Sequence, residues 1–175
     1  MDTHLLHIYT GNGKGKTTAA MGQALRVLGH NKKVVIAQLM KDGTTGELKS
    51  LGSLPGAVIY DGFIMKGFLR TRTEAERQLL RDRHREALEK LIELLEKEQP
   101  ALTVLDELNV ALAMGLVSPE DARRLIDVAL KTGDCVATGR HAGESLIAQA
   151  AYVTRMEAVK HPFDEGQPAR EGIEY

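Results

Sequence analysis

The most informative stretch of this 175-residue chain is Thr10-Gly11-Asn12-Gly13-Lys14-Gly15-Lys16-Thr17-Thr18. Before it, residues 5–10 form a short apolar segment that is typical of a β-strand. After it, residues 17–28 carry apolar side chains at helical spacing. A strand, a glycine-rich loop that ends in Gly-Lys-Thr, and a helix are the parts of a phosphate-binding P-loop.

Each residue type in this loop has a physical reason to bind phosphate. Glycines let several backbone N–H groups point at one anion, and the helix that begins near Thr17 adds the positive end of its dipole. Lys16 supplies a full positive charge, and the Thr17 hydroxyl is placed to bind a magnesium ion that bridges phosphates. Thr10 stands where the common spacing has its first glycine. The alternative is a glycine-rich turn with a surface lysine. The predicted phosphate-binding residues are Thr10, Gly11, Asn12, Gly13, Lys14, Gly15, Lys16, Thr17 and Thr18.

The rest of the chain alternates apolar, strand-like segments with helical patterns. We predict strands at residues 34–39, 57–60, 102–106, 135–138 and 152–159, helices at 72–98, 118–130 and 144–150, and a loop at 40–56. Such alternation gives parallel strands joined by right-handed crossovers. The predicted fold class is α/β, with a mostly parallel central sheet, helices on both faces and a P-loop NTPase (RecA-like) architecture. We expect a single nucleotide-binding domain over residues 1–175, with an extended tail at 160–175.

Composition excludes several classes of protein. Hydrophobic residues make up 43% of the chain, which is too many for a disordered protein. Lys and Arg number 23 against 24 Asp and Glu, so there is no basic excess to neutralise a nucleic acid. No apolar run is long enough to span a membrane, no secretory signal precedes the first strand, and Cys135 is the only cysteine. We therefore expect a cytoplasmic protein with neither a nucleic-acid nor a membrane partner.

Two carboxylates stand at the end of the predicted strand at 102–106. Ligands bind beyond the carboxyl ends of parallel strands, so Asp106 and Glu107 are placed at a site. In P-loop proteins the acid at the end of such a strand holds magnesium, and we expect this strand directly beside the first one. Asp106, Glu107 and Thr17 are therefore the predicted Mg²⁺ ligands. The alternative is an acidic N-cap for the segment that begins at Leu108.

Weaker signals come from single residues. Arg140 follows a predicted strand and could bind phosphate or a carboxylate, although a surface arginine in a turn is the alternative. Met40, Ile64, Met65 and Phe68 lie in or near glycine-containing segments. They could form an apolar rim for a large hydrophobic ligand, with ordinary core packing as the alternative.

Two further residues are predicted to be structural. His84 lies among charged residues of the helix at 72–98, so we expect it to be exposed to solvent. Cys135 lies within a predicted strand, where a free cysteine is most often a small buried hydrophobe.

Several motifs together resemble those of the P-loop corrinoid adenosyltransferases. They are Thr10-Gly-Asn-Gly-Lys-Gly-Lys-Thr-Thr-Ala-Ala20, Val104-Leu-Asp-Glu-Leu108, Thr138-Gly-Arg140 and Val159-Lys-His-Pro-Phe-Asp164. Gln38-Leu-Met-Lys41 with Gly46-Glu47, and residues within 166–174, also fit the family pattern. The resemblance covers nearly the whole chain, and its first and last motifs are more specific than a generic P-loop.

The resemblance implies that ATP and a reduced corrinoid are the substrates and Mg²⁺ the cofactor. Co(I) would attack the 5′-carbon of the ATP ribose, and tripolyphosphate would leave. In this reading Lys16 and Glu107 are catalytic, and Arg140 is a further ATP-binding residue. Met40, Met65 and Phe68 bind the corrinoid. A homodimer and a flavoprotein-type reductant are further implications.

The chain departs from the family pattern at two places. Arg70 stands where members commonly carry Trp, two residues after Phe68, and the chain has no Trp at all. Members often have an additional N-terminal helix, whereas the first predicted strand here begins within a few residues of Met1. The alternatives are a P-loop small-molecule kinase and a nucleotide-dependent ATPase or switch. The phosphate product, tripolyphosphate or ADP, distinguishes them from an adenosyltransferase.

Overall fold

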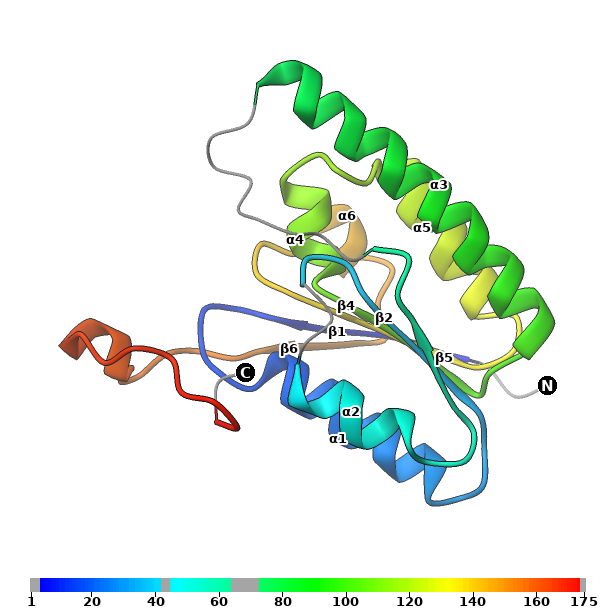
Figure 1. The fold of residues 1–175 in the computed structure, drawn as a ribbon, viewed down its shortest axis with the longest axis horizontal. Coiled ribbons are helices and arrows are strands. Elements are labelled where there is room, and N and C mark those ends of the chain that lie inside the picture. Colours follow the sequence, from blue (N-terminus) through cyan, green and yellow to red (C-terminus); the bar gives the residue numbers. More distant parts are fainter. Residues whose placement is uncertain (1–3, 42–44, 64–72, 174–175) are drawn as a thin grey trace.

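The computed structural model describes residues 4–41, 45–63 and 73–173 (Figure 1). Its elements are β1 (Leu6–Thr10), α1 (Lys16–Leu28), β2 (Val34–Gln38), α2 (Gly46–Gly52), β3 (Ala57–Tyr60), α3 (Glu74–Glu98), β4 (Leu102–Asp106), α4 (Leu108–Ala113), α5 (Pro119–Ala129), β5 (Asp134–Thr138), α6 (Glu144–Ile147), β6 (Tyr152–Arg155) and the 3₁₀ turn η2 (Pro162–Glu165). Among the helices in these ranges, none has both the length and the hydropathy needed to cross a lipid bilayer.

The six strands form one parallel sheet in the order β3-β2-β4-β5-β1-β6. This confirms the predicted α/β class. The expectation that the strand ending in Asp106 lies directly beside the first strand is wrong, because β5 lies between β4 and β1. Tyr9 pairs with Thr138, and Leu105 pairs with Ala137. Thr138 therefore bridges the P-loop and the end of β4.

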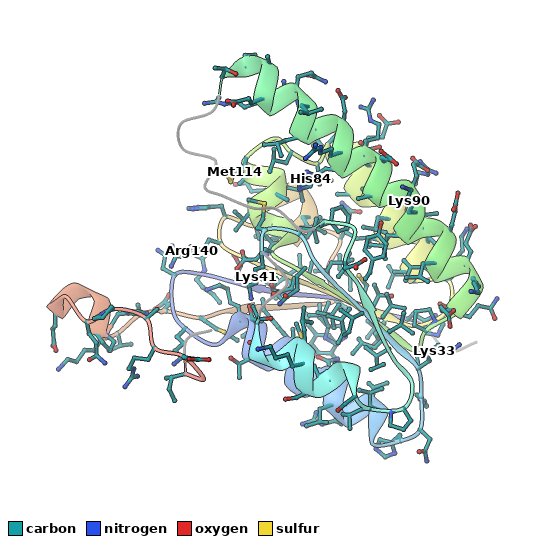
Figure 2. All side chains as sticks on the ribbon, viewed as in Figure 1. Lys33, Lys41, His84, Lys90, Met114 and Arg140 are labelled. Carbon is teal, nitrogen blue, oxygen red and sulfur yellow. The ribbon has the colours of Figure 1, made fainter. Side chains whose placement is uncertain are left out.

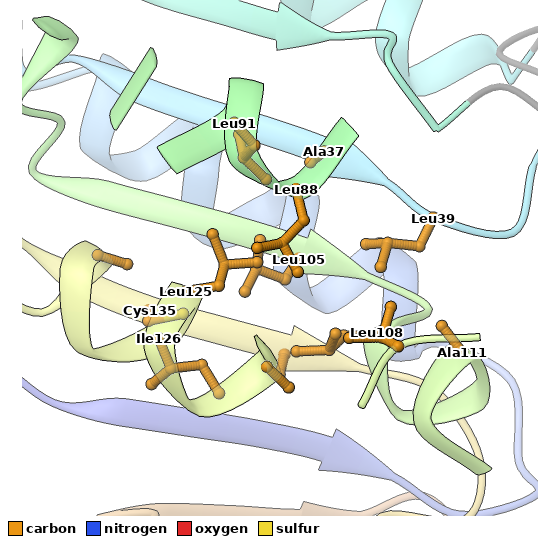
Figure 3. Close-up of a cluster of buried hydrophobic side chains, with 14 of the residues drawn as sticks. Ala37, Leu39, Leu88, Leu91, Leu105, Leu108, Ala111, Leu125, Ile126 and Cys135 are labelled. Carbon is orange, nitrogen blue, oxygen red and sulfur yellow. The ribbon is translucent and has the colours of Figure 1, made fainter. Parts of the chain in front are cut away.

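Helices cover both faces of the sheet, as predicted (Figure 1). α1 and α2 pack on one face, where their buried side chains meet those of β2 and β4. α3, α4 and α5 pack on the other, and Figure 3 shows Leu88 and Leu91 of α3 beside Leu105 of β4. Every residue of β2 and of β4 is buried. Central strands buried on both faces explain why both read as continuous apolar runs.

Three elements differ from the prediction. α2 falls within the predicted loop at 40–56, and α4 follows β4 without having been predicted. Both helices are short, so their propensity signal is weak, and α2 begins and ends with a glycine. β6 ends at Arg155, four residues before the predicted end at Val159. It is an edge strand with all four residues exposed, so apolar pattern alone could not locate its end.

The prediction that His84 is exposed is wrong, since only 3% of its surface is accessible. His84 occupies the same helical stripe as Leu80, Leu88 and Leu91, which face the sheet. Its Nδ1 bonds the carbonyl of Leu80, and its ring lies 5.7 Å from that of Phe63. The charged neighbours along α3 masked this position in the sequence. Cys135 is buried as predicted, and burial raises the pKa of its thiol to about 12.

A pair of glycine substitutions tests the packing. A Cβ at Gly133 would lie 2.3 Å from the carbonyl carbon and oxygen of Ala101, so the backbone between α5 and β5 would have to move. Gly133→Ala should lower the free energy of unfolding by about 1–3 kcal/mol. At exposed Gly22 in α1, a Cβ would meet no described atom within 4 Å, so Gly22→Ala should raise it by about 0.5–1 kcal/mol. Urea unfolding of the two variants measures both changes. A Gly133→Ala variant as stable as the parent would contradict this account.

Candidate functional site

A cavity of about 650 Å³ opens at the carboxyl edge of the sheet. Residues 12–18 of the P-loop form one wall, and Glu107 and Arg140 contribute from beyond β4 and β5. Lys41, which follows β2, lines it as well. Figure 2 shows Lys41 and Arg140 at this end of the molecule. Most of the predicted phosphate-binding residues are thus gathered around one space, while Thr10 and Asp106 are buried behind it.

Glycines shape the P-loop because another chain segment lies against it. Gly11 and Gly15 have φ of +97° and +115°, values that L side chains rarely adopt. A Cβ at Gly11 would lie 2.3 Å from the Met156 carbonyl oxygen, and one at Gly13 would lie 2.7 Å from the Glu157 carbonyl. The Gly13 N–H donates to that Met156 oxygen at 2.7 Å. The loop conformation is therefore fixed by the segment that follows β6.

The N-terminus of α1 suits an anion. Gly15 is the N-cap and has no side chain to accept from the first-turn N–H groups, and the first turn contains no acidic residue. Free N–H groups and the helix dipole favour phosphate at this position. The Lys16 Nζ lies over the loop and donates to the Gly13 carbonyl at 2.6 Å. Burial and the nearby Arg140 guanidinium lower the pKa of Lys16 from 10.5.

The Asp106 carboxylate connects several segments of the site through hydrogen bonds and an ion pair. It is 0% exposed, and one carboxylate oxygen accepts from the hydroxyls of Thr17 and Thr138, at 2.9 and 2.6 Å. The other oxygen accepts from the Gln38 amide at 3.0 Å and pairs with the Lys41 ammonium at 2.9 Å. A carboxylate offers about four acceptor positions, so these donors use all of them.

Glu107 is placed differently from Asp106. It is the N-cap residue of α4, but its side chain makes no capping hydrogen bond among the described residues, so the predicted alternative of an acidic cap is wrong. Its φ is +64°, which is strained for a residue other than glycine. A Cβ at Gly139 would lie 3.1 Å from Glu107 Oε2, so a larger residue there would crowd this carboxylate. Burial and the Asp106 charge raise the pKa of Glu107.

The side chains around the cavity fit a magnesium ion that arrives with phosphates. Within the described ranges, no group of three or more His, Cys, Asp or Glu side chains is arranged to hold a metal. Magnesium, however, usually binds proteins through one or two carboxylates, with phosphate and water as the other ligands. The Thr17 hydroxyl and the Glu107 carboxylate supply hard oxygen donors beside a loop built for phosphate.

Some cavity residues were not predicted from the sequence. Lys41, Glu47 and His161 line the cavity, as do residues 172–173 of the tail. Lys41 could have been found, because it follows the carboxyl end of a predicted strand. His161 and residues 172–173 lie in tail motifs that carry the family resemblance, but only the fold of the tail shows that they line the cavity.

The predicted corrinoid-binding residues are only partly accounted for. Met40 is partly buried and packs against the core cluster on the α3 face of the sheet. Ile64, Met65 and Phe68 lie outside the described residues.

Comparison with known proteins agrees with this geometry. A family model described as ATP:corrinoid adenosyltransferase BtuR/CobO/CobP matches residues 2–175. A corrinoid adenosyltransferase of Pseudomonas aeruginosa is 35% identical over 175 residues, covering 98% of this chain and 83% of the relative. Another, from a Sinorhizobium species, is 34% identical over 174 residues, covering 98% of this chain and 80% of the relative.

Among solved structures, a KaiC-like protein of Pyrococcus horikoshii superposes with a TM-score of 0.52 at 17% identity. The match covers 89% of this chain and 72% of that chain, and it supports the fold alone. The family model and the two relatives above 30% identity agree, and the chain belongs to the ATP:corrinoid adenosyltransferase family.

Proposed function

We propose that this protein transfers the adenosyl group of ATP to the cobalt of a reduced corrinoid, and that the P-loop cavity holds the triphosphate. The cobalt of Co(I) gives its electron pair to the 5′-carbon, so a Co–C bond forms and the cobalt becomes formally Co(III). The 5′-C–O bond breaks, and its electron pair leaves on tripolyphosphate. The convergence of Lys16, Lys41 and Arg140 on one P-loop cavity is the observation that supports this assignment best.

Lys16 and the loop N–H groups act on the leaving group. Negative charge accumulates on the triphosphate as the C–O bond breaks, and fixed donors aimed at that charge lower the barrier. Arg140 adds a planar cation that binds phosphate in a bidentate manner. No proton has to move at the reacting carbon, because the nucleophile is a metal centre and the leaving group is a bound polyphosphate. The site therefore needs positive charge more than it needs a general base.

Thr17, Asp106 and Glu107 are the proposed magnesium residues. Magnesium, when bound, supplies further positive charge to the leaving phosphates. Thr17 and Glu107 would offer it oxygens directly. Asp106 accepts a hydrogen bond from the Thr17 hydroxyl, which leaves the lone pairs of that hydroxyl for other partners. We assign Asp106 this indirect role because it is buried and its acceptor positions are already taken by Thr17, Thr138, Gln38 and Lys41.

The corrinoid side of the site is proposed from sequence. Met40, Met65 and Phe68 are the proposed contacts, and apolar side chains there would displace the lower ligand of cobalt and favour Co(I). Phe68 is the aromatic residue in that segment, since Arg70 replaces the usual Trp. We also propose a homodimer, a flavoprotein-type reductant and a cytoplasmic location. For the location, the support is one buried free thiol, Cys135.

Product analysis tests the proposed reaction against the kinase and ATPase alternatives. The protein is incubated without oxygen with ATP, Mg²⁺ and chemically reduced cob(I)alamin. Light-sensitive adenosylcobalamin and an equal amount of tripolyphosphate are the expected products, read by absorbance and by chromatography. Formation of ADP without adenosylcobalamin would reject the proposal and favour a kinase or an ATPase.

Lys16→Ala removes the loop cation that faces the leaving group. We expect kcat/KM for ATP to fall by about 100-fold or more, as when other fixed donors to a developing negative charge are removed. Steady-state adenosylation kinetics measure this loss. Lys90→Ala is the control, because Lys90 pairs with Glu86 on the solvent-exposed face of α3. Parental turnover by Lys16→Ala would remove Lys16 from the mechanism.

Asp106→Asn and Glu107→Gln should distinguish a role in stabilising the fold from a role in binding the metal. Asp106→Asn places an amide among donors that need an acceptor, so the free energy of unfolding should fall by about 3 kcal/mol. Glu107→Gln should leave unfolding nearly unchanged but raise the Mg²⁺ concentration needed for half-maximal turnover. Thermal unfolding and Mg²⁺ titration of activity measure the two effects. An unchanged Mg²⁺ requirement in Glu107→Gln would assign Glu107 a structural role only.

A further inference from the structure

The Lys41 ammonium lies between two residues proposed to serve the metal. Its Nζ is 2.9 Å from Asp106 Oδ2 and 3.3 Å from Thr17 Oγ1. The Lys41 side chain is only 23% exposed and follows β2 at the carboxyl edge of the sheet, where Figure 2 labels it. A positive charge of the protein itself is thus fixed beside the Thr17 hydroxyl.

The hydrogen bonds of Thr17 show how the Lys41 ammonium affects metal binding at the Thr17 hydroxyl. The hydroxyl has one proton and two lone pairs. The hydroxyl donates a hydrogen bond to Asp106 Oδ1 at 2.9 Å, and one of its lone pairs accepts a hydrogen bond from the Lys41 ammonium at 3.3 Å. A magnesium ion on Thr17 would need a lone pair at about 2.1 Å. The Lys41 ammonium and the magnesium ion would then share one hydroxyl oxygen, and two positive charges so close together repel each other strongly.

We propose that Lys41 is an internal counter-ion that keeps divalent cations off Thr17 until a triphosphate draws its ammonium away. The inference rests on the proposed function, because it assigns the P-loop cavity to ATP. Lys41 lines that cavity together with Lys16, so phosphate oxygens offer its ammonium a new partner. The metal ion then enters with the nucleotide and not before it.

The buried Asp106 explains why such an exchange is favourable. A carboxylate that is 0% exposed is costly without a compensating positive charge. Lys41 supplies that charge directly. When the ammonium moves to the triphosphate, a metal ion on Thr17 restores positive charge next to Asp106. The carboxylate thus keeps a cation nearby throughout, and Lys41 gains a place at the leaving group.

Manganese binding tests the proposal without any corrinoid. Mn²⁺ is titrated into nucleotide-free protein and free Mn²⁺ is measured by electron paramagnetic resonance. Lys41→Met should bind Mn²⁺ at least about tenfold more tightly than the parent, because the competing ammonium is gone. In a second arm, ATP binding is measured by calorimetry in EDTA, where Lys41→Met should bind about threefold or more weakly. Unchanged or weaker Mn²⁺ binding by Lys41→Met would overturn the proposal.

Two further variants secure the interpretation. Lys41→Gln keeps a hydrogen-bond donor for Asp106 but has no charge, so it should also bind Mn²⁺ more tightly than the parent. It keeps the test valid if Lys41→Met folds poorly. Lys14→Met removes the same charge from another part of the cavity lining. If it tightens Mn²⁺ binding as much as Lys41→Met does, a general field effect replaces the proposed competition. Since neither arm involves adenosyl transfer, failure of the proposed function would be seen separately.

Discussion

The structure depends on one buried carboxylate. Asp106 has no exposed surface, yet it accepts hydrogen bonds from Thr17 and Thr138 and binds Lys41 and Gln38. These donors come from the P-loop helix, from β5 and from β2 and the residues after it. A carboxylate in an apolar interior is stable only when its acceptors are satisfied, so the N-terminus of α1 must converge with the carboxyl ends of β2 and β5. The same convergence places Lys16 and Glu107 around a single cavity.

Two of the four non-glycine residues with positive φ in the described part of the chain lie at this edge of the sheet. Glu107 and His141 both have positive φ, and both line the cavity. Such conformations cost free energy and persist where the surroundings determine them, which is common at functional sites. At Glu107 the surroundings are visible, because its N–H donates to Thr138 Oγ1 and its carboxylate lies over Gly139. The strained turn aims the carboxylate at the cavity instead of at the first turn of α4.

Local signals explain what could be predicted from the sequence. The P-loop, the buried strands and the two acids at the end of β4 are marked by residue type and spacing along a short stretch, so the sequence predicts them. Other features are set by contacts between distant segments. The position of β5 between β4 and β1, the burial of His84 and the pairing of Lys41 with Asp106 belong to this group. Short helices such as α2 are hard to predict for a different reason, because a few residues carry only a weak signal of helix propensity.

The strand order has a consequence for synthesis of the chain. Among the six described strands β1 is synthesised first, but its partners in the sheet are β5 and β6, which are synthesised after the other strands. Pairing across such sequence separation is slow, because a long loop must close before any contact stabilises it. The P-loop therefore acquires its shape late, when residues near Met156 can bond Gly13. Affinity for nucleotide is therefore gained only after β5 and β6 have been synthesised, and until then β1 has no partner strand.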